Sequence, residues 1–238
     1  MEILPVFIGY DPREDSAFQV CRRSLVKHSS IGLHVIKLNR NALEWPPGGG
    51  IYNRPWTIAR GQRTDLKDLK PFSTEFSFTR FLVPVLQQYE GWALFCDSDF
   101  LFRADVAELV QWQDDRYAAC VVKHNYNPTE QVKMDGCVQE NYDRKNWSSL
   151  ILWNCGHPSN RLLTRDVVNT KEGSWLHGFR WLKDDEIGPL PHSWNYLVGH
   201  TKGIEPKAIH YTLGIPEMPG YEKCEFADLW WEERGQVE

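Results

Sequence analysis

Two carboxylates stand one residue apart at the end of an apolar stretch, a spacing suited to metal binding. The apolar residues 92–96 lead into Asp97-Ser98-Asp99, and Phe100-Leu101-Phe102 follows. In an extended segment, side chains at i and i+2 point the same way, so Asp97 and Asp99 can converge on one hard cation while Ser98 points elsewhere. The alternative is a turn in which the Asp and Ser side chains bond their own backbone. A cation held by the two acids could carry a diphosphate.

The segments around this pair alternate between strand and helix patterns, which predicts an α/β fold. The chain opens as a β-α-β unit, in which Asp11-Pro12-Arg13-Glu14 supplies an acidic N-cap, a proline at the first helical position and a glutamate three residues after the cap. The stretches 39–70 and 123–145 are expected to be long loops, of which the first can lie over a site. Strands are expected at 4–9, 33–38, 92–96, 117–122 and 149–153, and helices at 12–28, 73–88 with a kink at Pro84, 104–110 and 160–169.

Length, charge and composition restrict the class of protein. The 238 residues are 42% hydrophobic, which suits one large α/β domain or two tightly joined halves. A net charge of -5 leaves no basic stripe, so binding to nucleic acid backbones is not expected. No charged leader and no run of about 18 apolar residues is found, so a cytoplasmic protein without a transmembrane segment is expected. No C-x-x-C pair occurs, and reduced thiols are expected at Cys21, Cys96, Cys120, Cys137, Cys155 and Cys224.

The C-terminal stretch 225–233 looks amphipathic. It could dock on its own domain, on a second subunit, or on a membrane face as a peripheral contact, although its acidity disfavours anionic lipid.

The order of several short motifs resembles the A-type glycosyltransferases. The likeness is to family 8, the glycogenin and lipopolysaccharide galactosyltransferase group, and it extends from Val6 to about Pro216. It implies a Rossmann-like mixed central sheet flanked by helices, with a nucleotide-binding half over 1–125 and a sugar and acceptor half over 126–238. The motifs that carry it are Gly9-Tyr10-Asp11, Ser77-Phe78-Thr79-Arg80-Phe81, Asp97-Ser98-Asp99, Asn154-Cys155-Gly156, Asp184-Asp185-Glu186, Trp194-Asn195 and His210.

The resemblance implies a manganese ion, or magnesium, held by Asp97, Asp99 and His210. The ion would bridge the diphosphate of a UDP-sugar donor, from which a hexose passes to an acceptor with retention. An imidazole beside oxygen ligands favours manganese over magnesium. Taken without the motif order, His210 reads as an ordinary core or surface histidine. Family members commonly place a lysine soon after this histidine to grip the diphosphate, whereas Gly214 is followed here by Ile215-Pro216, so Lys202 or Lys223 is a possible replacement.

The resemblance also assigns residues to the nucleotide. The carboxyl end of the first strand is where an open α/β sheet offers a crevice. There Ile8 and Gly9 would let the backbone approach, Tyr10 would stack near the uracil, and Asp11 would accept from the base or ribose. Asp11 can equally be a helix cap, and Tyr10 can be rim packing. Arg80 would reach the nucleotide-sugar, or be a solvated helix charge. Ser98 and Gly214 complete the expected cofactor-binding set.

Asp184 and Asp185 are the residues that the resemblance places beside the transferred sugar. Asp184 would bind sugar hydroxyls, and Asp185 would shield or attack the anomeric carbon, although adjacent acids are also typical of a solvated charge run. Asn154 and Gly156 match the segment that cradles the sugar, with a plain strand-end turn as the alternative.

Two other functions remain open at this point. A sugar-phosphate nucleotidyltransferase shares such a sheet and an acid-bound metal, but it usually needs a glycine-rich phosphate loop, which Gly9-Tyr10-Asp11-Pro12 is not. A noncatalytic nucleotide- or sugar-binding protein could keep the fold without turnover.

Overall fold

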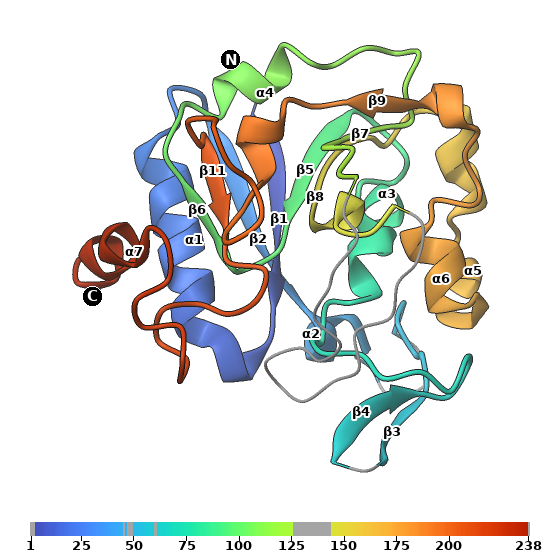
Figure 1. Ribbon diagram of the computed structural model, residues 1–238. Helices are drawn as coiled ribbons and strands as arrows, with labels where there is room; N and C mark the ends of the chain where they lie inside the picture. Colours follow the sequence, from blue (N-terminus) through green and yellow to red (C-terminus); the bar gives the residue numbers. More distant parts are fainter. Residues whose placement is uncertain (1–2, 45, 47–49, 60, 126–143, 238) are drawn as a thin grey trace.

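The computed structural model describes residues 3–44, 46, 50–59, 61–125 and 144–237 (Figure 1). A six-stranded sheet of order β2-β1-β5-β8-β7-β9 forms its centre, and a smaller sheet of order β10-β11-β6 stands beside it. The strands of the central sheet are β1 (Leu4–Tyr10), β2 (Leu33–Asn39), β5 (Trp92–Cys96), β7 (Ala119–Val121), β8 (Leu150–Asn154) and β9 (Ile187–Pro189). The smaller sheet contains β6 (Phe100–Phe102), β10 (Tyr196–Leu197) and β11 (Ala208–His210).

One strand runs against the other five in the central sheet. β1 pairs in parallel with β2 and β5, and β7 pairs in parallel with β9, whereas β8 is antiparallel to both β5 and β7. The carboxyl ends of β1, β5, β7 and β9 therefore meet at one edge, together with the first residue of β8. This edge, the lower one in Figure 1, is where ligands of open α/β sheets bind.

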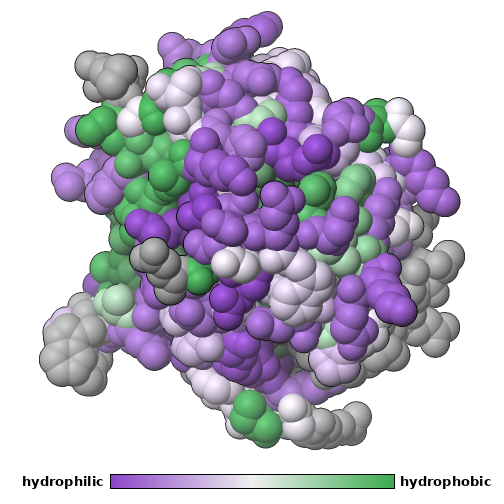
Figure 2. Space-filling model, turned by 90° about the vertical axis from the view of Figure 1, so that its left-hand side faces the viewer, coloured by the Kyte–Doolittle hydropathy of each residue, from purple (hydrophilic) through white to green (hydrophobic). Residues whose placement is uncertain are grey.

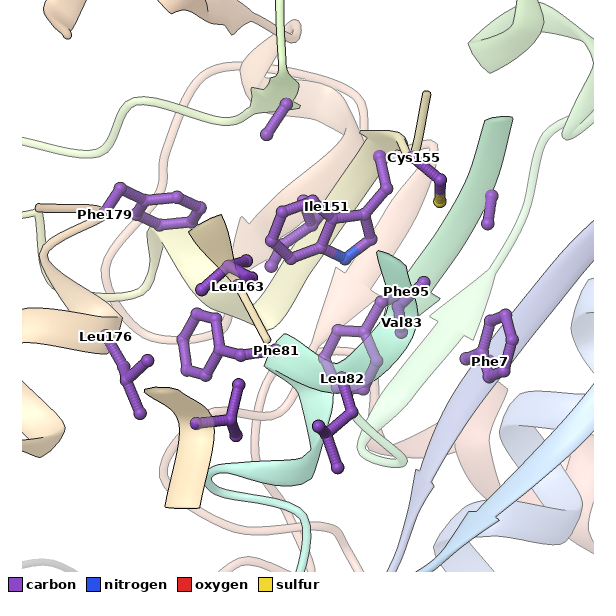
Figure 3. Packing of buried hydrophobic residues seen from close by; sticks show 14 of the residues in the cluster. Phe7, Phe81, Leu82, Val83, Phe95, Ile151, Cys155, Leu163, Leu176 and Phe179 are labelled. Carbon is purple, nitrogen blue, oxygen red and sulfur yellow. The ribbon is translucent and has the colours of Figure 1, made fainter. Parts of the chain in front are cut away.

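Both faces of the central sheet are buried, and the sequence alternates between them. Val6 and Ile8 of β1 face one hydrophobic cluster and Phe7 faces the other; β5 and β8 alternate in the same way. Figure 3 shows Phe81 and Val83 packing with Phe95 and other apolar side chains on one of these faces.

Helices cover both faces of the sheet. In Figure 1, α1 and α7 lie on one side, and α3, α5 and α6 lie on the other. The described helices are α1 (Asp15–Lys27), α2 (Arg40–Glu44), α3 (Val83–Leu86), α4 (Ala107–Val110), α5 (Arg165–Thr170), α6 (Gly173–His177) and α7 (Ala227–Arg234). The expected mixed α/β fold is confirmed, as are the opening β-α-β unit and the predicted strands of the central sheet.

Two predicted segments differ most from the structure, and the helix predicted over 160–169 is divided between the 3₁₀ turn η4 (Pro158–Leu162) and α5. The helix predicted over 73–88 is reduced to a 3₁₀ turn, η2 (Thr79–Leu82), and the short α3, with Pro84 in the first turn of α3. Pro84 lacks the N–H that a helix interior needs, and the Ser77 hydroxyl donates to the Thr74 carbonyl at 2.8 Å, which favours a local turn. The stretch 39–70 is not all loop, because it contains α2 and the hairpin of β3 (Trp56–Ala59) and β4 (Gln62–Asp65). Most of the predicted loop 123–145 lies outside the described residues.

The C-terminal helix docks on its own domain. Trp230 of α7 is buried against the cluster formed with α1 and the smaller sheet, and the buried Glu233 pairs with Arg23 at 2.7 Å and Lys27 at 2.9 Å. Trp231 remains 43% exposed. Figure 2 shows the face that carries these helices, on which hydrophilic residues predominate and hydrophobic ones gather toward the left. No helix in the described part of the chain is long and apolar enough to cross a membrane.

The described cysteines Cys21, Cys96, Cys120, Cys155 and Cys224 are all free thiols, as expected, and Cys137 lies outside the described residues.

Candidate active site at the carboxyl edge of the sheet

Asp97, Asp99 and His210 come together where the two sheets meet. One side-chain donor atom from each lies within 4.8 Å of the others. Asp97 directly follows β5 of the central sheet, and Asp99 directly precedes β6 of the smaller one. β6 pairs antiparallel with β11 in a register that sets His210 opposite Phe100, and this places the imidazole beside the acids.

The two acids converge through a turn and not through an extended segment. Residues 98 and 99 form a turn between β5 and β6. The Asp97 amide donates to the Ser149 carbonyl at 2.9 Å, and the Tyr211 amide donates to the Asp99 carbonyl at 3.0 Å. The motif is therefore a strand-end turn, and within this turn both carboxylates lie near His210. Ser98 is buried.

Three neighbours, Arg80, Phe100 and Asn195, orient the side chains of Asp97 and His210. Arg80 of η2 is buried, lies 2.8 Å from Oδ1 of Asp97, and donates to the Ser148 carbonyl at 2.8 Å. The His210 ring is stacked on Phe100 at 4.4 Å between centroids, and its Nδ1 is 2.9 Å from Oδ1 of Asn195. Arg80 is thus a buried partner of Asp97 in the cleft and is not a solvated helix charge, and its predicted contact with the nucleotide-sugar stays a prediction.

The charges of the site shift its carboxyl groups in opposite directions. Burial raises the pKa of Asp97 to about 6; the guanidinium of Arg80 opposes this rise, and the charge of Asp99 adds to it. Burial also acts to raise the pKa of Asp99, but His210 outweighs it and holds this pKa below its usual value.

The donor set fits a divalent cation. Oδ1 of Asp99 is buried and has no hydrogen-bond partner among the described residues, since the nearby Nε2 of His210, at 3.4 Å, is too far for a good hydrogen bond. Two carboxylates and one imidazole suit manganese or magnesium, with the imidazole favouring manganese. A bound cation would give Oδ1 of Asp99 a partner and would reduce the electrostatic repulsion between the two carboxylates.

A cleft of about 360 Å³ opens in front of these residues. Arg80, Asp97, Asp99, His210 and Gly214 line it, and the Gly214 amide donates to the Tyr211 carbonyl at 2.9 Å in the turn after β11. The loop that follows β4 and the first and last residues of α6 form other parts of its wall. Residues 68 and 70 in this loop belong to the segment 39–70, which was predicted to be a loop that can lie over a site.

Among the residues expected to hold the nucleotide, the four at the end of β1, Ile8 to Asp11, have structural partners and do not line the cleft. Ile8 is fully buried in the core. A Cβ on Gly9 would lie 2.5 Å from the ring of Phe76, so this glycine is required by packing. The Tyr10 hydroxyl donates to Asp15 at 2.9 Å, and its ring packs edge-on against Phe18, which matches rim packing.

Asp11 is a helix cap and the centre of an ion-pair cluster. Its fully buried carboxylate accepts from the Arg13 amide at 3.1 Å, from the Arg13 guanidinium at 2.9 Å, from Arg63 at 2.5 Å and from the Glu75 amide at 3.2 Å. Burial acts to raise the pKa of Asp11, but the hydrogen bonds from Arg13 and Arg63 outweigh it and lower this pKa to about 2. Glu14, which the sequence suggests as a capping partner, makes no side-chain cap bond and lines the cleft.

Replacing Asp11 with asparagine is expected to lower the free energy of unfolding by about 2 kcal/mol at pH 7. Because the folded-state pKa lies below the unfolded value, the stabilisation from Asp11 is complete above about pH 4 and is lost as the pH falls toward 2. Urea unfolding of both proteins at pH 7 and at pH 3 checks this. A difference in stability that does not shrink at pH 3 would contradict it.

Four residues assigned to the sugar lie at the opposite edge of the sheet, which corrects the expectation. β8 is antiparallel to β5, so Asn154 pairs with Trp92, at the end of β5 away from Asp97. Asn154 and Gly156 belong to a strand-end turn there. Asp184 and Asp185 precede β9, whose first residue is beside the start of β7, and both side chains are exposed. Arg144 pairs with Asp184.

The cleft contains residues that the motif analysis did not select. Lys145 is 4% exposed and lines the cleft, whereas Lys202 and Lys223 are exposed and do not. His177 of α6 also lines it and shares a 2.8 Å hydrogen bond with the Ser148 hydroxyl. The segment 145–149 occupies the cleft because the first residue of β8, and not its last, lies at the edge of Asp97; strand direction was the missing signal.

This arrangement defines the A-type glycosyltransferase fold. Solved structures that share it include the bifunctional glycosyltransferase WbbM (TM-score 0.67, 16% identity), GlyE of Streptococcus pneumoniae (0.61, 14%) and the galactosyltransferase LgtC with donor and acceptor sugar analogs (0.56, 14%). The matches cover 99%, 98% and 98% of this chain, and 50%, 60% and 96% of the three chains. The chain thus spans about half of WbbM and three fifths of GlyE.

At the level of sequence, the chain is 49% identical to Protein CDI of Arabidopsis thaliana over 231 residues, which cover 94% of this chain and 83% of that protein. The chain belongs to the same family as Protein CDI. No family model matches it.

Proposed function

We propose that this protein is a metal-dependent glycosyltransferase that moves a hexose from a UDP-sugar to an acceptor. The observation that carries the proposal is the convergence of Asp97, Asp99 and His210 at the mouth of a cleft, at the carboxyl edge of a glycosyltransferase fold. Retention, and membership of family 8, rest on the resemblance of the motif order. The acceptor is a carbohydrate or another hydroxyl compound.

The residues of the site divide the work between binding and charge control. Asp97, Asp99 and His210 would hold Mn²⁺ or Mg²⁺, which when bound neutralises the diphosphate and stabilises the charge that develops on the departing UDP. Arg80 keeps the Asp97 carboxylate oriented through its contact of 2.8 Å. Gly214 and its turn lie in the same cleft. Because glycine has no side chain, phosphate oxygens can approach the backbone closely at this position.

Lys145 is the residue that we assign to the diphosphate in place of the missing lysine after His210. It lines the cleft, and its segment is fastened to the metal-side acids because Asp97 and Arg80 donate to the carbonyls of Ser149 and Ser148. An ammonium group there adds positive charge to the cleft.

Replacing Lys145 with methionine is expected to weaken UDP binding by about 10-fold or more, because a hydrogen bond to a charged group is worth about 1.5–3 kcal/mol. Binding of uridine, which has no phosphate, should be unchanged. Calorimetric titration of both ligands measures the two effects, with Lys202→Met as a control at an exposed position. Equal losses for UDP and uridine would contradict a role at the phosphates.

A donor screen tests the proposed function. UDP release is measured with UDP-glucose, UDP-galactose and other UDP-sugars, with Mn²⁺, with Mg²⁺ and with EDTA. We expect metal-dependent release from at least one donor, and loss of it in His210→Ala. Formation of diphosphate from UTP and a sugar 1-phosphate would instead indicate a nucleotidyltransferase. UDP binding without release from any donor would indicate the noncatalytic alternative, for which the structure gives no separate support.

A further inference from the structure

We propose that Asn195 is a positioning residue that fixes the tautomer of His210 and joins the two segments that carry the metal ligands. The inference rests on the proposed metal site. Asn195 ends the turn η6 (His192–Asn195), just before β10, and is fully buried. Its Oδ1 is 2.9 Å from Nδ1 of His210, while its Nδ2 donates to the Ser149 hydroxyl at 2.8 Å and to the Asn146 carbonyl at 3.3 Å.

The hydrogen bonds around Asn195 determine which way its amide faces. The Asn146 carbonyl can only accept, so it must face the NH₂ group of Asn195. The Ser149 hydroxyl donates its own hydrogen to the same carbonyl at 2.7 Å, so it too accepts from that NH₂ group. The amide oxygen is therefore the atom that meets His210.

This orientation sets the protonation of the imidazole. An amide oxygen only accepts, so Nδ1 of a neutral His210 must carry the hydrogen. The lone pair is then on Nε2, the nitrogen that lies 3.4 Å from Oδ1 of Asp99. A metal ligand needs its lone pair on that side, because Asp97 and Asp99 contribute their oxygens there.

The same side chain connects His210 to the loop of Asp97. The Ser149 hydroxyl binds Asn195, and the Ser149 carbonyl accepts from the Asp97 amide at 2.9 Å. His210 on β11 and Asp97 after β5 are thereby held in one network. Loss of Asn195 should disturb both the tautomer of His210 and the separation between His210 and Asp97.

The chain offers a matched control for burial alone. Asn160 is also fully buried and makes three hydrogen bonds, to the carbonyls of Ala118 and Asn154 and from the Trp181 indole. It lies at the edge of the sheet away from Asp97. A purely structural asparagine should affect stability and leave metal affinity unchanged.

Mn²⁺ affinity of the folded proteins is the first measurement. Asn195→Leu is expected to raise the dissociation constant by about 10–100-fold, since outer-shell partners of metal ligands have effects of this size. Asn195→Asp keeps an acceptor for Nδ1 and should lie closer to wild type, while Asn160→Leu should match wild type. An unchanged constant in a folded Asn195→Leu, or an equal loss in Asn160→Leu, would overturn the proposal.

The imidazole tautomer of the metal-free protein is the second measurement, read from the ¹⁵N chemical shifts of His210. The hydrogen should be on Nδ1 in wild type and in Asn195→Asp, and Asn195→Leu, or Asn195→Ala should the leucine variant not fold, should show a mixture. A hydrogen on Nε2 in wild type would overturn the proposal. If wild type binds no Mn²⁺ but shows the expected tautomers, the proposed metal site fails while the role of Asn195 in orienting His210 stands.

Discussion

Replacing Asp99 with asparagine is expected to weaken Mn²⁺-dependent UDP binding by at least about 100-fold, because outer-shell partners alone account for 10–100-fold. The amide has nearly the same shape but lacks the charge that a hard cation requires. The backbone bond from Tyr211 to the Asp99 carbonyl does not involve the side chain, so the turn should persist. Calorimetric titration of UDP at fixed Mn²⁺ measures the loss.

Two comparisons make this result specific. Circular dichroism should show an unchanged fold for Asp99→Asn. Asp166→Asn, which changes an 81% exposed acid in the first turn of α5, should bind UDP as wild type does. Unchanged UDP binding by a folded Asp99→Asn would remove Asp99 from the metal site.

The largest expected effect on stability comes from Arg54. Its guanidinium and the Asp65 carboxylate form two 2.7 Å hydrogen bonds, with both side chains 1% exposed. Arg54 also donates to the carbonyls of Val168 at 2.9 Å and Lys171 at 2.6 Å, so it ties the β3–β4 hairpin to α5. Arg54→Met leaves an unpaired buried carboxylate and two unpaired carbonyls, and should cost about 3–5 kcal/mol.

Urea unfolding measures this cost, and two variants interpret it. Arg116→Met breaks the exposed pair with Asp114 and should leave the free energy of unfolding unchanged within experimental error. In Arg54→Met/Asp65→Leu no charge is left buried, so much of the loss should be recovered. A loss in Arg54→Met as small as that in Arg116→Met would show that the pair does not hold the hairpin.

Much of the fold could be predicted from the sequence because the relevant signals are local. The apolar runs of β1, β5 and β8 mark strands buried on both faces, and Asp11-Pro12 marks the start of the first helical segment. The β3–β4 hairpin gave no such signal, because it is held by the pair of Arg54 with Asp65, and the partner of Arg54 on α5, Val168, is more than 100 residues away in the sequence.

The site residues that short-range spacing brings together were predicted from the sequence. The residues whose position depends on the direction of a strand were not. Asp97 and Asp99 share a turn, and the order of motifs pointed to His210. Asn154 was assigned to the site from its place at the end of a strand, but β8 is antiparallel, and its first residues reach the cleft instead. Lys145, in a polar stretch, carries no motif at all.

The most direct test of the central claim is a calorimetric titration of UDP into the protein with Mn²⁺ present and again after chelation. The proposed metal site at Asp97, Asp99 and His210 predicts binding with a micromolar dissociation constant that disappears when the metal is removed. Binding of equal strength in both conditions, or no binding in either, would contradict a metal-dependent nucleotide-sugar site in this cleft.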